Sequence, residues 1–410
     1  MVTDTDRTRI TYRLELQRAV PHGILESAGS TFLLLIALKY FHAGPTAKAL
    51  VASGGSVGLM LAPMVVSCVA RRRWPAAHAA AGFAAVGAGI FLLLGLVPWL
   101  PFYVVGCIAG MTAATAVIPL MTQIYQDNYP EASRGKLFSR AVMLRIAVHA
   151  AFSEVAGRLL EVDMQRSRAL LFLFAVAFAF ASSRLTRYPS SPLHDEGGTH
   201  PFRAMRHVRE DRLFRHTLVC WMLMGFANLM MLPLRIEYLG NPAYGLNLNV
   251  QQIALLIGVV PNIARLAMNQ VWGVLFDRMN FFALRVLLNI GFALSILTFF
   301  LSSSLTGLVV GAIIFGVSNS GGDVAWGLWV TKLAPPARVA DYMSVHVFFT
   351  GLRGVIAPIV AFHLVGVLSL PVIGCLSAGL ILLASVLLLP EIRWFRGLRA
   401  DRRVVEGVSE

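Results

Sequence analysis

The chain has 410 residues, of which 57% are apolar and 14% are charged, and its mean hydropathy is +0.69. Soluble proteins carry about 25% charged residues, so this composition excludes an ordinary soluble globular protein and favours a polytopic membrane protein. The net charge of +14 does not indicate nucleic-acid binding, because the basic residues lie in short runs between apolar segments, as in membrane loops.

Long apolar segments follow a polar N-terminal segment, 1–19, which lacks the apolar run of a cleaved signal peptide. A bilayer core of about 30 Å requires about 20 helical residues. This length predicts an all-α membrane protein with twelve transmembrane helices, at 21–42, 48–70, 76–97, 100–124, 137–160, 168–186, 214–236, 251–275, 281–303, 306–331, 340–365 and 370–390.

The longest polar segment between spans, 188–213, divides the twelve spans into two groups of six. We therefore expect an N-terminal six-helix bundle at 20–187 and a C-terminal bundle at 214–390, pseudo-symmetric and joined by a central loop. Of the 35 Lys and Arg residues, 26 fall on the side that holds both chain ends and 5 on the other. Because basic loops stay in the cytoplasm, 1–19, 188–213 and the C-terminal tail 391–410 are predicted to be cytoplasmic.

The two halves share a layout around their fourth and fifth spans. The loop after span 4 contains Arg134, and the loop after span 10 ends in Arg338. Each loop is followed by a span with an internal Arg, Arg145 in span 5 and Arg353 in span 11. Such internal symmetry is typical of transporters that are built from repeats.

The loop after span 8 reads Gly273-Val-Leu-Phe-Asp277-Arg278. With the twelve spans and the central loop, this segment resembles the Gly-x-x-x-Asp-Arg signature of the major facilitator superfamily. The resemblance implies alternating access, in which two bundles rock around a site near the membrane midplane. It also implies structural or gating roles for Gly273, Asp277, Arg278, Arg134 and Arg338. We expect Gly273 to allow close helix approach and Asp277 to cap the next helix.

Three arginines lie in the middle of spans, as judged from a helical rise of 1.5 Å per residue. These are Arg145, Arg265 and Arg353. Each costs about 2.5–3.5 kcal/mol at a helix centre, so they should face the protein interior. Together they predict an anion site. Asn262 shares a helix face with Arg265, and Asn319 and Trp326 share one with Asp323 in span 10. The alternative is that internal acids neutralise them, the candidates being Glu26, Glu154 and Asp323.

Two of these acids, Glu26 and Asp323, are the candidate proton carriers, because burial can keep a carboxylic acid protonated at neutral pH. His149 and His346 lie on the polar faces of spans 5 and 11 and are further candidates.

The sequence therefore predicts a secondary active transporter in the cytoplasmic (inner) membrane, and three alternatives stay open. We expect symport of a small organic anion with protons by a monomer, with the lipid bilayer as surroundings and without a cofactor, a metal or a nucleic-acid partner. The alternatives are efflux of amphipathic or neutral compounds with structural Arg pairs, a polytopic membrane enzyme, and a transporter-like receptor. No metal-ligand spacing or Gly-rich phosphate loop favours the enzyme.

Overall fold

The computed structural model describes residues 4–192, 202–334 and 339–407, and within these ranges the chain is helical and contains no strand. The first half comprises α1 (Asp4–Ser27), the π-helical turn η1 (Ala28–Phe32), α2 (Leu33–Lys39), α3 (Pro45–Arg71), α4 (Ala76–Leu96), α5 (Leu100–Thr115), α6 (Ile118–Asn128), α7 (Glu131–Val162) and α8 (Ser167–Leu185). The second half comprises α9 (Arg206–Glu210), α10 (Arg212–Gly240), α11 (Val250–Ala254), the π-helical turn η5 (Leu255–Val259), α12 (Val260–Arg278), α13 (Phe281–Phe300), α14 (Leu305–Leu333), α15 (Val339–Leu364) and α16 (Leu370–Gly407).

Eleven helical segments in the described ranges are long and apolar enough to cross a membrane. The all-helical membrane architecture is therefore confirmed. The predicted span 137–160 lies in α7, which is not among the eleven. The reason is charge, because α7 carries Arg145, Glu154 and Arg158 within its apolar part. The count of twelve spans remains a prediction that depends on α7.

The segment predicted as an N-terminal tail, 1–19, is helical from Asp4 and continuous with the first span. Glu15 is buried in this segment because its charge is paired with Arg18. The Glu15 carboxylate lies 2.7 Å from Arg18 Nη2 and accepts a hydrogen bond of 2.6 Å from the Tyr188 hydroxyl. Arg18 also donates to the Tyr125 hydroxyl at 2.8 Å. The C-terminal tail is likewise not separate, since α16 continues to Gly407.

The helix that follows the predicted signature loop is capped by a different residue from the one expected. The side chain of Asn280 accepts hydrogen bonds from the backbone N–H groups of Phe282 and Ala283 at the start of α13. Asp277 is exposed within α12. The expected close approach at Gly273 is also wrong, since a Cβ built there would meet no described atom within 4 Å.

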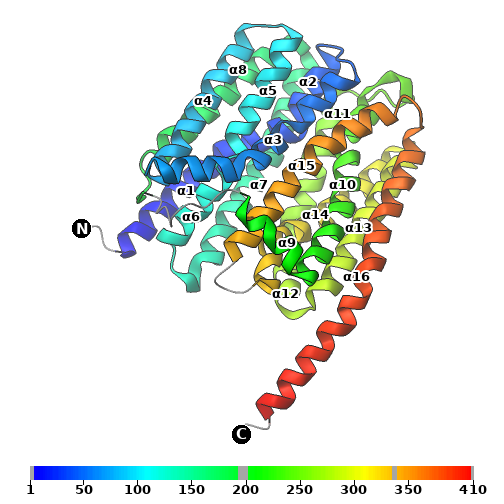
Figure 1. The fold of residues 1–410 in the computed structure, drawn as a ribbon. Helices are drawn as coiled ribbons and strands as arrows, with labels where there is room; N and C mark the ends of the chain where they lie inside the picture. Colours follow the sequence, from blue (N-terminus) through cyan, green and yellow to red (C-terminus); the bar gives the residue numbers. More distant parts are fainter. Residues whose placement is uncertain (1–3, 193–201, 335–338, 408–410) are drawn as a thin grey trace.

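Figure 1 shows the two halves side by side, with the N-terminus and the C-terminus at the same end of the molecule. They pack against each other through α3 and α15, and through α7 and α12. The two backbones approach closely at Gly351 of α15, where a Cβ would lie 2.4 Å from the backbone nitrogen of Met60 in α3. Only a residue without a side chain allows the two backbones to meet there.

Gly351→Ala is expected to destabilise this interface by about 1–3 kcal/mol, the usual cost of overpacking. The added methyl group has a backbone as its neighbour and cannot be accommodated by a rotamer change. The thermal unfolding midpoint of the purified protein measures the effect. Gly379→Ala in α16 is the matched control, because a Cβ there meets no described atom within 4 Å. Equal midpoints for the two variants would contradict the expectation.

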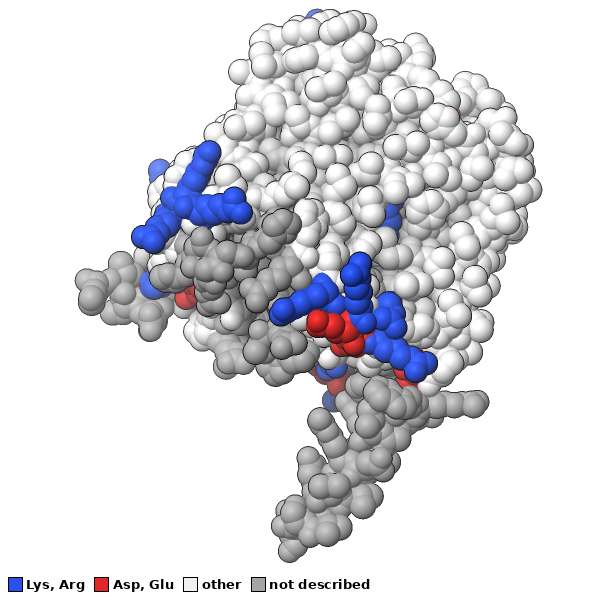
Figure 2. Space-filling model, in the orientation of Figure 1, with Lys and Arg blue, Asp and Glu red and all other residues white. Residues whose placement is uncertain are grey.

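Basic side chains gather toward the end of the molecule that holds both termini, whereas most of the remaining surface in this view is uncharged (Figure 2). The exposed basic residues of the first half include Arg71, Arg72 and Arg73 at the end of α3, and those of the second half include Arg206, Arg209, Arg212 and Arg215 in α9 and α10. This distribution has the pattern of a membrane protein whose basic loops lie on one side.

Candidate functional site

Glu26 of α1 lies at the centre of a group of ion pairs between the two halves. Its Oε2 atom is 2.8 Å from Arg145 Nε of α7, which belongs to the same half. Its Oε1 atom accepts a hydrogen bond of 2.8 Å from Arg265 Nη1 of α12, which belongs to the other half. One carboxylate thus joins arginines from both bundles.

Arg265 continues the group into the second half. Its Nε atom donates a hydrogen bond of 2.6 Å to Asp323 Oδ2 of α14. Asn262, one turn earlier on α12, accepts from Arg265 Nη1 at 3.3 Å and donates to the Gly258 carbonyl at 2.6 Å. We call Glu26, Arg145, Arg265 and Asp323 the central network.

The central network contains two arginines and two carboxylates, so its formal charges balance. Its members differ in accessibility. The Arg265 side chain is 7% exposed, whereas those of Glu26 and Asp323 are 24% and 41% exposed. Arg265 is therefore the buried bridge, and the two carboxylates are the groups that a solute or a proton can reach. Removing one partner of a buried ion pair is costly because it leaves an uncompensated charge.

His149, one helical turn after Arg145 on α7, borders the central network. Its Nδ1 atom lies 3.7 Å from Glu26 Oε1, and its Nε2 atom is hydrogen-bonded to the Ser30 hydroxyl at 3.2 Å. The ring is 3% exposed. Of the two histidines predicted to carry protons, His149 is the one that the structure brings to this site.

Both π-helical turns lie beside the central network. Ser30 belongs to η1, which begins two residues after Glu26. Gly258 belongs to η5, and its carbonyl accepts from Asn262, three residues before Arg265. π-Helical turns occur frequently at functional sites because they displace the helix face by one residue.

Arg353 does not reach the central network. It is 6% exposed and extends from α15 toward α10, where its Nη1 atom donates to the Trp221 carbonyl oxygen. A second buried guanidinium, Arg285 of α13, stacks over the Trp221 ring with its Cζ atom 3.8 Å from the ring centroid. His346 of α15 lies 5.2 Å from Trp221 and 5.1 Å from Trp329, measured between ring centroids. We call Arg285, Arg353, His346, Trp221 and Trp329 the basic–aromatic cluster.

The remaining predicted residues lie at varied positions. Trp326 is half-buried beside the basic–aromatic cluster, with its ring 5.6 Å from that of His346. Asn319 is half-buried on α14, one turn before Asp323. Arg278 is exposed at the end of α12. Arg134 lies in α7, but its side chain is outside the described part of the structure, and so is Arg338.

The sequence analysis does not predict the ion pair that lies at the end of the molecule opposite the termini. Lys48 of α3 donates a hydrogen bond of 2.6 Å to Glu237 of α10, and the two residues are 5% and 2% exposed. Nearby, Lys39 donates to Asn247 at 3.3 Å, and Glu161 accepts from the Val250 backbone N–H at 2.7 Å. These contacts join the two halves. Lys48 and Glu237 each lie in an apolar helix, which is the one signal that could have indicated them.

The fold is that of a polytopic helical membrane protein and is shared with solved structures of three transporters. A mutant form of nucleoside transporter NupG superposes with a TM-score of 0.75 at 14% sequence identity, over 93% of this chain and 99% of that chain. The xylose transporter XylE from E. coli, in an inward open conformation, gives a TM-score of 0.64 at 15% identity, over 94% of this chain and 95% of its own.

A third solved structure is a POT family transporter in complex with a thioalcohol-conjugated peptide. Its TM-score is 0.70 at 12% identity, over 94% of this chain and 96% of that chain. No family model and no curated protein matches the sequence. At these identities the similarity establishes the fold, and the residues of the site have to be argued from their own geometry.

Proposed function

We propose that the protein is a secondary active transporter that works by alternating access, with twelve spans and both termini in the cytoplasm. The shared fold with three transporters supports it, and so does the gathering of basic residues near the termini. The observation that carries the proposal is the central network, because a charge-balanced group between two bundles can respond to a solute and to their relative movement.

The contacts between the halves support a state that is closed at the outer end. Three contacts join the halves at the end opposite the termini, namely Lys48–Glu237, Lys39–Asn247 and Glu161–Val250. Asp323, near the middle of the fold, still exposes 41% of its side chain. This combination fits a transporter whose central network is reached from the cytoplasmic side.

The charge balance of the central network suggests how protons and an anion can be coupled. When Asp323 or Glu26 takes a proton, Arg265 or Arg145 loses part of its neutralisation. An anionic solute can then supply the missing negative charge, because a guanidinium binds a carboxylate through two parallel hydrogen bonds. When the proton leaves on the other side, the ionised acid competes for the arginine and releases the solute. The transported unit is one anion with one proton.

Glu26→Gln and Asp323→Asn test this coupling. At least one of them is expected to exchange solute across proteoliposomes at a rate within about threefold of the unaltered protein, yet to lose accumulation driven by a pH gradient. An amide cannot take up and release the proton but preserves the shape of the site. Asp127→Asn is the control, since Asp127 is exposed at the end of α6 and pairs with Gln123. Unchanged pH-driven accumulation in both amide variants would end the coupling proposal.

A neutral polar solute is the second candidate, and the balance of two arginines and two carboxylates favours it. Such a site can bind hydroxyl and amide groups without requiring a countercharge. The names of two structural neighbours, a nucleoside transporter and a xylose transporter, agree with it. Uptake screens with matched pairs, a monocarboxylate and its primary amide, distinguish the two candidates. The anion is excluded if the amide is transported as fast as the acid.

A further inference from the structure

The basic–aromatic cluster of the C-terminal bundle buries two guanidiniums that have no carboxylate partner among the described side chains. Arg285 is 2% exposed and Arg353 is 6% exposed. Their recorded polar contacts are the Met224 sulfur, 3.0 Å from Arg285 Nη2, and the Trp221 carbonyl oxygen for Arg353. They are close enough to repel each other. An uncompensated buried charge is costly, and the cost is usually removed by a counterion.

Several buried nitrogen atoms around these guanidiniums also lack partners in the described part of the chain. They are Arg353 Nε, the indole Nε1 atoms of Trp221 and Trp329, and the two ring nitrogens of His346, of which a neutral ring carries one N–H. His346 is 1% exposed and Trp329 is fully buried. Buried donors without acceptors are rare in folded proteins. Their convergence in one cluster indicates an acceptor group that the protein chain does not itself supply.

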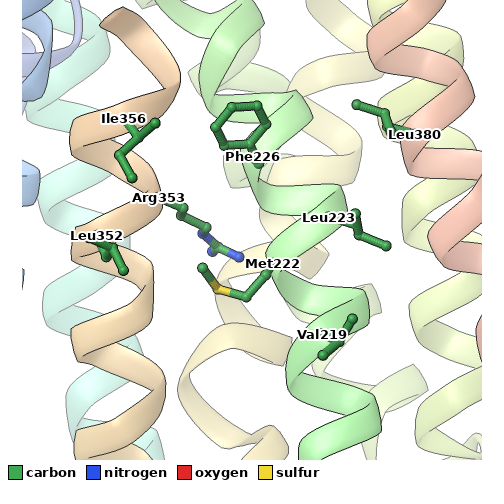
Figure 3. Close-up of a pocket in the computed structure, with 8 residues that line it drawn as sticks. All are labelled: Val219, Met222, Leu223, Phe226, Leu352, Arg353, Ile356 and Leu380. Carbon is green, nitrogen blue, oxygen red and sulfur yellow. The ribbon is translucent and has the colours of Figure 1, made fainter. Parts of the chain in front are cut away.

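A pocket of about 310 Å³ leads to Arg353 from between α10, α15 and α16. Its other lining residues are apolar and include Met222, Phe226, Ile356 and Leu380. Figure 3 shows the Arg353 side chain extending from α15 toward Met222 on α10, among these apolar residues. Val219 and Ile356, which also line the pocket, are 49% and 44% exposed on the outer surface of the bundle. The walls of the pocket are therefore apolar, and Arg353 borders it with a guanidinium that packs against Gly225 of α10.

We propose that this pocket binds an amphipathic monocarboxylate, such as a medium-chain fatty acid, with its carboxylate at Arg353 and its alkyl chain against the apolar walls. Arg285 and the neighbouring indole N–H groups add positive potential behind the carboxylate. The volume is at the lower end of the 300–1,000 Å³ that is typical of small-molecule sites. The site is separate from the central network and does not depend on what that network transports.

The depth of Arg353 selects a carboxylate over a phospholipid headgroup. The apolar part of α15 is Tyr342–Leu364, and Arg353 lies eleven residues from each end, about 17 Å by helical rise. A phosphodiester stays ionised and cannot reach the middle of the hydrocarbon without a large cost. A carboxylic acid can enter in its neutral form and ionise beside the guanidinium.

Dodecanoate is the probe, titrated into the purified full-length protein in phosphatidylcholine nanodiscs while thermal unfolding is followed. Ligand that binds the folded state raises the unfolding midpoint. We expect dodecanoate to raise it, and its apparent affinity to fall at least tenfold in Arg353→Gln and in Leu380→Trp, which fills the pocket. Leu383→Trp is the matched control, because Leu383 is 48% exposed on the same helix and does not line the pocket.

Two further ligands separate the parts of the proposal. Methyl dodecanoate has the chain without the charge, and acetate has the charge without the chain. Both are expected to bind at least tenfold more weakly than dodecanoate. The proposal is overturned if either binds as tightly, or if the dodecanoate shift persists in both Arg353→Gln and Leu380→Trp. It is also overturned if phosphatidylglycerol in the nanodisc, rather than dodecanoate, gives the Arg353-dependent shift. If Arg353→Gln fails to fold, the comparison of Leu380→Trp with Leu383→Trp decides.

Discussion

Arg265→Met is expected to abolish transport, with initial uptake in proteoliposomes reduced at least about 100-fold. Arg265 is the only described side chain that joins Glu26 to Asp323, and it does so from a buried position. Its loss leaves two carboxylates with one arginine. Because these carboxylates are 24% and 41% exposed, the cost is below the about 3–5 kcal/mol of breaking a fully buried pair. Arg265→Lys should recover part of the activity, since an ammonium restores the charge but not the planar fork that spans two acids.

The control for this substitution is Arg158→Met in α7. Arg158 forms an ion pair of 2.5 Å with Glu154, but its side chain is 68% exposed. Exposed pairs contribute about 0–1 kcal/mol, so uptake should stay within about twofold of the unaltered protein. Uptake must be normalised to the amount of folded, inserted protein. If Arg265→Met and Arg158→Met transport equally well, the central network is structural and the site lies elsewhere.

Glu237→Gln is expected to open the outer end of the protein. The substitution leaves the Lys48 ammonium buried without its carboxylate, at a cost of about 3–5 kcal/mol that is relieved when the halves separate and water enters. A shift of this size moves the balance of conformations by about 100-fold or more. Ser30 is exposed beside the central network, so a cysteine there reports opening through labelling by an impermeant maleimide from outside.

The labelling experiment uses a background in which the exposed Cys68 and Cys375 are replaced by Ser. Labelling at position 30 should become at least tenfold faster in Glu237→Gln. Lys39→Gln, which removes an exposed contact with Asn247 at the same end, should have little effect. The double variant Lys48→Met with Glu237→Leu should close the outer end again, because an apolar pair replaces a buried ion pair at little cost. Equal labelling in all variants would mean that this pair does not hold the halves together.

The helical segments could be predicted from the sequence because each depends on a local property, a stretch of about 20 apolar residues. The charged residues of the central network were identified for the same reason, since a charge inside an apolar helix is visible locally. Their partners were not identifiable. Arg265 pairs with Glu26 across 239 positions, and no spacing rule connects residues on different helices.

The direction in which a buried side chain points is a second property that the sequence does not reveal. Arg353 and Arg265 lie at similar depths by helical rise, which is why the sequence predicts that they share one anion site. Depth does not fix the direction in which a side chain points across a bundle, and Arg353 points toward α10 instead. Arg285 lies four residues from the start of the predicted span 281–303, and its 2% exposure could not be predicted from that position. The predicted roles of Gly273 and Asp277 rested on resemblance, and local packing assigns the cap to Asn280.

The π-helical turn η1 has a consequence for how sites of this kind can change. A π turn holds one residue more than an α turn, and one residue corresponds to about 100° of rotation around the helix axis. The angular position of Glu26 relative to the buried outer part of the span, Leu33–Ala37, is therefore set by the number of residues in Ala28–Phe32. Gain or loss of a single residue in this turn is therefore expected to rotate α1 relative to Leu33–Ala37 and to change which of its side chains faces Arg145 and Arg265. The chemistry of the central network is thus encoded partly in chain length, so proteins of this fold can differ in what they bind through an insertion rather than a substitution.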